Sequence, residues 1–133
     1  MINTTTDFII PAAYALTGNI PGSLVVRGDI SYENIEWNTG IVTTTLPTKD
    51  EVLNKAQELY NNEAVTRLRV HRNRLMANSD WTQGADSPLS TSKKTEWATY
   101  RQALRDLPAS SNPSVDSRGE LNLTSVTWPT QPS

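Results

Sequence analysis

Few residues in this chain are of types that carry chemistry, and their spacing does not assemble a catalytic site. The 133 residues include one histidine, His71, and no cysteine. A catalytic histidine needs an acid or hydroxyl positioned beside it, and the sequence places none next to His71. We find no Gly-rich phosphate loop, no His-Glu-x-x-His motif and no calcium-binding loop. The sequence therefore predicts that the protein is not an enzyme and has no metal or cofactor site.

A cluster of arginines surrounds this histidine. Its members are Arg67, Arg69, Arg72 and Arg74. On a helix, Arg67, His71 and Arg74 share one face, and the other two lie on another. A nucleic-acid-binding helix needs a continuous basic face and more positive charge, whereas the formal net charge here is −2. We expect a solvated helix surface and no nucleic-acid binding. An acidic partner patch is an open alternative, for which residues 1–47, with one arginine and four acids, are one candidate.

Aromatic residues give a more specific pattern. Four apolar residues fall at i, i+3, i+7 and i+10, and they are Trp97, Tyr100, Leu104 and Leu107. This spacing predicts one buried helical stripe. Trp81 follows a helix stop, and Trp128 lies in a polar tail, where it either docks on its own helices or meets a partner. Tryptophan is favoured at binding hot spots, and Arg101 and Arg105, one turn apart off the stripe, could make charge-assisted contacts. Our candidate partner-binding residues are Trp81, Arg101, Arg105 and Trp128.

The secondary-structure elements that must position these residues differ between the two halves of the chain. Residues 8–10, 24–26 and 41–45 are β-branched or apolar runs between Gly, Pro and Asn turns, which indicates short strands. Residues 31–37 could pair with the runs on either side. We expect a small antiparallel sheet of three or four strands. A sheet of this size buries little, so it should rest on a helix or on another chain.

Helical signals begin after residue 47. Thr48 and Glu51 have the spacing of a capping box, and apolar residues recur at helical spacing up to a stop at residues 78–80. Asn61 and Asn62 weaken the pattern, so one long helix and two shorter ones both stay open. A further helix should start at Ser90 or Thr91 and end at Pro108. The short loop before it predicts a helical hairpin, followed by a Ser/Asn/Pro-rich tail with a brief strand near residues 121–126.

Composition bounds the size of the core. Hydrophobic residues make up 36% of the chain, and even with its six glycines added the share stays below the roughly 45–50% of ordinary domains. A partner or an oligomer should therefore bury part of the apolar surface. No run approaches the ~20 apolar residues that span a bilayer, and we expect a soluble protein without membrane contact. The overall expectation is an α+β fold: a small N-terminal antiparallel β region, a central helix, and a C-terminal helical hairpin with an extended tail. We place the boundary between a β region, 1–47, and a helical region, 48–133.

The second half of the chain resembles a known family. The runs that carry the resemblance are 74–75 (RL), 80–83 (DWTQ), 86–90 (DSPLS), Trp97, 100–108 (YRQALRDLP) and 128–129 (WP). Together they resemble the phage tail assembly chaperone domain, a short module of bacteriophage and prophage tail proteins. One departure is the polar run 92–95 (SKKT) at the start of the last helix. The first half is similar to small tail-associated proteins of cyanobacterial phages at 13–16 (AYAL), 28–29 (GD), 35–37 (IEW) and 47–51 (PTKDE).

This resemblance implies a non-enzymatic helper in tail or tail-fibre assembly. Its partner would be a phage tail, tail-fibre or baseplate protein, with a homo-oligomer as an open option. Its place would be the host cytoplasm during assembly, and retention in the virion tail stays open. The alternative is a permanent structural component of the tail, tail fibre or baseplate.

Overall fold

The computed structural model describes residues 6–133, and they form two compact units. One unit runs up to residue 63 and includes residues 115–119, and the other comprises residues 64–114 and 120–133. A single helix, α2 (Lys49–Asn78), contributes to both units. The boundary predicted after residue 47 rests on sequence texture alone and stays a prediction.

The first unit contains a two-stranded antiparallel sheet, a short helix and the beginning of α2. Its elements before α2 are η1 (Thr6–Phe8), α1 (Ile9–Leu16), β1 (Leu24–Val26), η2 (Tyr32–Asn34) and β2 (Ile35–Trp37). Leu24 lies opposite Trp37 and Val26 opposite Ile35 in the sheet. The strands expected at 24–26 and within 31–37 are therefore confirmed.

Two other predicted strands are wrong. Residues 8–10 end η1 and begin α1, because Pro11 is tolerated in a first helical turn and the alanines after it favour helix. Residues 41–45 form no strand. The carbonyl of Asn38 accepts hydrogen bonds from the amides of Ile41 and Val42, both at 3.0 Å, so a turn uses the amides that would have started a ladder.

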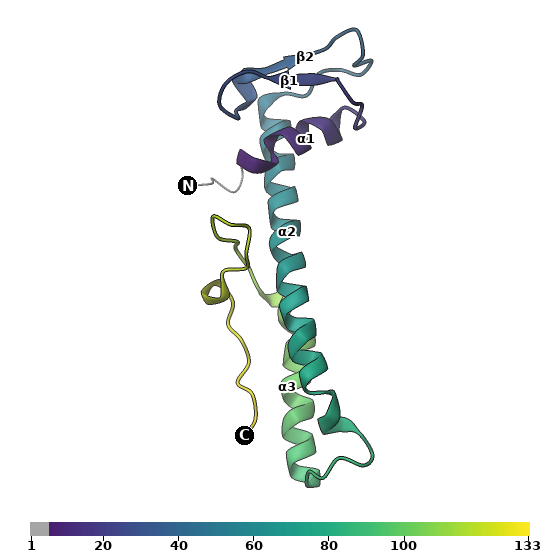
Figure 1. Ribbon diagram of the computed structural model, residues 1–133, viewed down its shortest axis with the longest axis vertical. Helices are drawn as coiled ribbons and strands as arrows, with labels where there is room; N and C mark the ends of the chain where they lie inside the picture. The colour runs from purple at the N-terminus through teal and green to yellow at the C-terminus, as the bar shows by residue number, and fades with distance from the viewer. Residues whose placement is uncertain (1–5) are drawn as a thin grey trace. The chain divides into compact units, whose positions relative to one another are not determined.

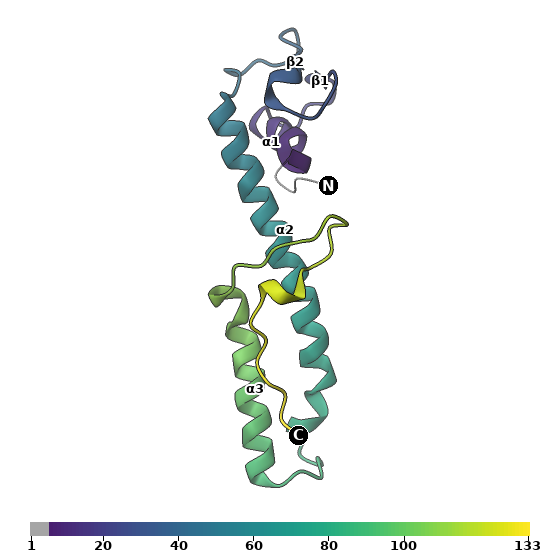
Figure 2. The same ribbon diagram turned by 90° about the vertical axis from the view of Figure 1, so that its left-hand side faces the viewer.

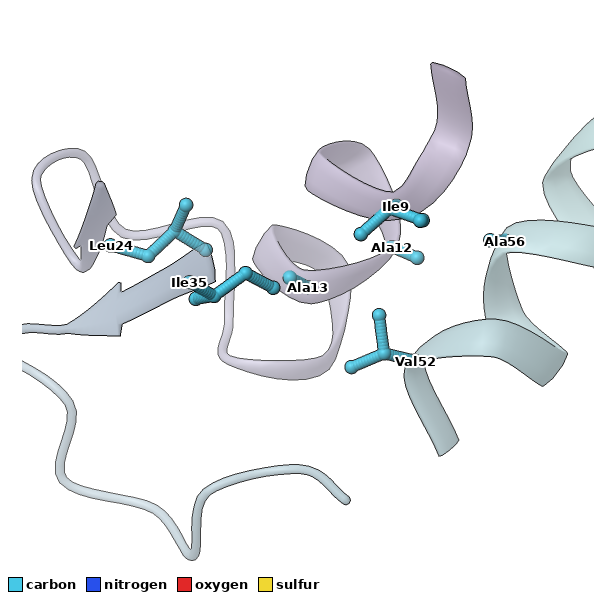
Figure 3. Packing of buried hydrophobic residues seen from close by; sticks show 7 residues of the cluster. All are labelled: Ile9, Ala12, Ala13, Leu24, Ile35, Val52 and Ala56. Carbon is cyan, nitrogen blue, oxygen red and sulfur yellow. The ribbon is translucent and has the colours of Figure 1, made fainter. Parts of the chain in front are cut away.

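The core of this unit is built largely from small residues. Its fully buried members include Ala12 and Ala13 of α1 and Ala56 of α2. Figure 3 shows them facing the larger side chains of the cluster, Ile9, Leu24, Ile35 and Val52. Small side chains let the two helices and the sheet come close with little apolar area. The sheet therefore rests on helices of its own chain, as one of our two alternatives predicted.

The start of α2 has the predicted capping box. The Thr48 amide donates to Glu51 Oε2 at 2.7 Å, and the Glu51 amide donates to Thr48 Oγ1 at 3.3 Å. The helix continues without a break through Asn61, whose side-chain oxygen accepts from Gln57 Nε2 at 2.9 Å. That contact along the helix surface keeps the asparagine side chain away from the backbone, where it would compete with helical hydrogen bonds. The alternative of a single long helix is thus correct.

The second unit is a helical hairpin with an extended tail along it. Its elements after α2 are η3 (Asp80–Gln83), α3 (Thr91–Ser110) and η4 (Leu123–Ser125). Ser90 caps α3 by accepting from the Lys93 amide at 3.2 Å, and α3 runs two residues beyond the predicted end at Pro108. Figures 1 and 2 show the tail running along the hairpin formed by α3 and the second half of α2. The predicted stripe on α3 is buried.

The tail forms a turn where we expected a brief strand. The side-chain oxygen of Asn122 accepts from the amide and the hydroxyl of Thr124 at 3.3 and 2.7 Å, a local bond that competes with strand pairing.

The α+β fold class is confirmed. Within residues 6–133, no helix is both long and apolar enough to cross a membrane.

Two valines of the first unit test how much its small core contributes. Val52 is fully buried, whereas the Val25 side chain on β1 is 52% exposed. Val52→Ala should lower the free energy of unfolding by about 2 kcal/mol, since it removes buried methyl groups and leaves a cavity. Val25→Ala should cost about 0.5 kcal/mol or less. Urea denaturation of both variants measures the difference, and equal losses would contradict the core described here.

Candidate functional site

The turn that closes the hairpin begins at the last residues of α2. The Ser79 hydroxyl donates to the Met76 carbonyl at 2.9 Å, and the buried Thr82 hydroxyl donates to the Ser79 carbonyl at 2.6 Å. Helix ends leave carbonyls without a helical partner. These two hydroxyls satisfy part of that need, so the chain leaves α2 in a tight, ordered η3 turn.

Arg101 of α3 adds further donors at this end of α2. Its side chain is buried, and Nη1 donates to the Met76 carbonyl at 2.8 Å and to Ser79 Oγ at 2.7 Å. Nη2 donates to Asp80 Oδ1 at 2.8 Å. A positive charge at a helix C-terminus is also favoured by the helix dipole. One guanidinium thus joins α3 to the end of α2 and fixes the position of Asp80.

Trp81 follows this anchored aspartate and is the exposed member of an aromatic row. Its ring centroid lies 6.1 Å from that of Trp97, which lies 5.7 Å from Tyr100 in an edge-to-face arrangement. Trp97 and Tyr100 are buried, and burial raises the pKa of the Tyr100 hydroxyl. Trp81 itself is 54% exposed. The hairpin turn therefore presents half of an indole ring whose other side is held in place.

The rest of the turn is tied back to the start of α3. Gln83 Nε2 donates to the Lys94 carbonyl at 3.1 Å, and Lys94 Nζ donates to the Gly84 carbonyl at 3.2 Å. These reciprocal contacts hold the loop after Trp81 on the first turns of α3. Trp81 is consequently flanked by ordered backbone on both sides.

Arg72 joins α2 to the other end of α3. Its Nη1 donates to the Leu104 carbonyl at 3.4 Å and to the Arg105 carbonyl at 3.5 Å. Proline has no amide hydrogen, so Pro108 cannot donate to the Leu104 carbonyl four residues earlier. The long bond from Arg72 reaches the carbonyl that this proline leaves open, which explains how α3 tolerates Pro108.

Trp128 docks on helix α2 of its own chain. Its ring centroid lies 4.7 Å from that of His71 on α2, and Nε1 donates to the Leu123 carbonyl at 3.1 Å. The residue is partly buried and packs against the apolar cluster that includes Leu68 and Leu104. His71 is half-buried next to this ring. A contact between Trp128 and a partner stays a prediction.

The four predicted residues do not form one continuous set. Trp81 and Arg101 both belong to the hairpin turn, through Asp80. Arg105 is exposed one turn further along α3, where Nη1 donates to Gln102 Oε1 at 3.4 Å. Trp128 belongs to the tail. The sequence argument missed Asp80 as the partner of Arg101 and His71 as the docking site of Trp128, and neither pairing has a sequence signal at such separations.

Exposed and anchored aromatic residues are typical of protein-binding modules. In the described residues no group of three His, Asp or Glu side chains comes together that could hold a metal ion.

A family model described as phage tail assembly chaperone protein matches residues 65–133, just over half of the chain. The chain therefore belongs to the phage tail assembly chaperone family and has a role in phage tail assembly. No curated protein and no solved structure matches it. The predicted family is confirmed, while the similarity to cyanobacterial phage proteins stays a prediction.

The contribution of Arg101 can be measured against Arg105 on the same helix. Arg101→Ala should lower the free energy of unfolding by about 2 kcal/mol or more, because it removes a buried side chain together with its charge-assisted hydrogen bonds to the Met76 carbonyl and the Ser79 hydroxyl. The ion pair with the largely exposed Asp80 carboxylate adds little to this figure. Arg105→Ala should change stability by about 0.5 kcal/mol or less. Chemical denaturation of the two variants would refute this account if their losses were equal.

The docking of the tail through Trp128 leads to a separate prediction. Trp128→Ala removes the ring that packs against His71 and part of the apolar cluster, so it should lower the free energy of unfolding by about 2 kcal/mol. Trp128→Phe keeps a ring against His71 and should recover about half of the loss. The measurements are the thermal midpoint and the rate of proteolysis within the tail. An unchanged midpoint for the alanine variant would show that the tail does not dock in solution.

Proposed function

We propose that this protein is an assembly chaperone for the phage tail or tail fibre, and that it binds a tail, tail-fibre or baseplate protein through the hairpin turn. The observation that carries the proposal is the half-exposed indole of Trp81, held by its contact with Trp97. A large apolar side chain left in water costs free energy, and a rigid one loses little entropy on binding. Trp81 is therefore suited to insert into a partner.

Arg101 has a different part in this proposal. Its buried guanidinium bonds Asp80 Oδ1 and the end of α2, so it positions Trp81 and does not itself reach the partner. Arg105 is exposed on α3 and can supply a charge-assisted contact at the rim of the same interface. Trp128 would contribute by completing the hairpin core, and through its uncovered surface if the partner extends along the tail.

A helper of this kind needs no catalytic group, in accord with the role implied by the family. It would act in the host cytoplasm while tails are assembled. It would shield or align its partner and then leave. The alternative, a permanent structural component of the tail, tail fibre or baseplate, differs in where the protein is found at the end.

Fractionation of an infection distinguishes the two. The full chain, carrying a small epitope tag, should be found in infected-cell lysate bound to a tail, tail-fibre or baseplate protein. It should be absent from purified particles after a high-salt wash. Recovery in those particles at a fixed ratio to a known tail protein would overturn the chaperone proposal in favour of the structural one.

The Trp81 surface has its own test. Trp81→Ala should raise the dissociation constant for the partner recovered above by about 30-fold, which corresponds to about 2 kcal/mol at a hot-spot tryptophan. Stability should fall by about 1 kcal/mol or less, since half of the ring is already exposed. Trp81→Phe keeps the aromatic contact and should retain most of the affinity. Calorimetric titration measures both variants, and unaltered binding by the alanine variant would exclude this surface.

A further inference from the structure

A second surface of the hairpin unit is a pocket between α2 and the C-terminal tail. It has a volume of about 420 Å³. Among the residues that line it are Arg67, Val70, His71 and Arg74 from α2 and Glu120 and Leu123 from the tail. All of them belong to the same compact unit. The pocket lies on the arginine face predicted from the sequence, and the hairpin-turn surface does not include it.

The pocket combines positive charge with exposed apolar side chains. Val70 is 58% exposed, and Leu123 is about half exposed. The two lining arginines outweigh the single carboxylate of Glu120, which leaves a formal charge of +1 at the pocket. Arg67 and Glu120 already have interaction partners. Arg74 is exposed and, within residues 6–133, makes no hydrogen bond or ion pair. A ligand carboxylate could therefore bind Arg74 without displacing a bond.

The pocket is already formed without a ligand. The Trp128 ring packs against His71 in a tilted arrangement, and Trp128 Nε1 donates to the Leu123 carbonyl. One wall is thus a continuous helix, and the other is a tail fixed by the contacts of Trp128. A preformed site loses less entropy on binding than one that must be ordered.

We propose that this pocket binds an acidic segment of the tail protein that the chaperone assists. A carboxylate of that segment pairs with Arg74, whose fork of donors matches a carboxylate in a bidentate manner. An apolar side chain next to it covers Val70 and Leu123. The inference rests on the proposed function and names the chemistry of the partner. It gives the chaperone a second contact in addition to Trp81.

Two other occupants fit the charges less well. A nucleic acid carries a charge at every phosphate and needs a continuous basic face, whereas the pocket offers two arginines, of which Arg67 already has an interaction partner. The acidic first region of a second copy has two of its four acids engaged already. Glu36 pairs with Arg27 at 2.7 Å, and Glu33 pairs with Lys49. An acidic segment of another protein needs no such exchange of partners.

The test is site-specific photocrosslinking in infected cells with the full chain. Val70→p-benzoylphenylalanine places the probe in the pocket, and mass spectrometry identifies the peptide captured. The expected product is a segment of a tail, tail-fibre or baseplate protein that contains Asp or Glu. Arg74→Glu should lower the yield by about tenfold or more, because it sets like charges against each other. Arg69→Glu, which changes an exposed arginine outside the pocket, is the matched control and should keep the yield within about twofold.

Charge reversal completes the experiment. Exchange of the captured acid for arginine in the partner should restore crosslinking to the Arg74→Glu variant. Equal yields for the two arginine variants would overturn the inference, as would capture of nucleic acid or of a second copy. A probe at Trp81 separates the two proposals. Crosslinking of the partner at Trp81 but not at Val70 would contradict the pocket proposal and leave the proposed function intact. Crosslinking at neither site would contradict the proposed function as well.

Discussion

The guanidinium of Arg101 is the interaction on which the hairpin unit depends. It donates to the Met76 carbonyl near the end of α2 and to the Ser79 hydroxyl, and it pairs with the carboxylate of Asp80. Because these acceptors follow one another along the chain, a single side chain sets the direction in which the backbone leaves α2. Trp81 comes next, and its exposure is a result of that direction.

The thin composition of the chain explains why its tail is structural. With 36% hydrophobic residues, the hairpin cannot enclose its own stripe, and Val126 and Trp128 of the tail complete the apolar cluster. The first unit meets the same shortage in another way, with alanines that bring its helices and sheet close together. Apolar side chains that stay exposed, such as Trp81 and Val70, are therefore notable in a chain that has few to spare.

Sequence patterns predicted the helices of this fold better than its sheet. Capping by Thr48, the stripe on α3 and the hairpin follow from local spacing, and the structure has all three. The runs at 8–10 and 41–45 are apolar or β-branched, but a proline with alanines in one case and a turn at Asn38 in the other outweighed β propensity. At the site, the residue types were informative and the pairings were not. Arg101 with Asp80, and His71 with Trp128, join positions whose proximity arises only from tertiary packing.

The docking of Trp128 on His71 also bears on the order in which the parts of the hairpin unit fold. Contacts between α2 and α3 at the turn join residues 22 to 25 positions apart, whereas Trp128 must return across the whole of α3. Since the entropic cost of closing a loop grows with its length, we expect the hairpin to close before the tail docks on it. During synthesis the tail also leaves the ribosome after both helices. Opening of the tail would then expose the apolar residues that Val126 and Trp128 cover between α2 and α3.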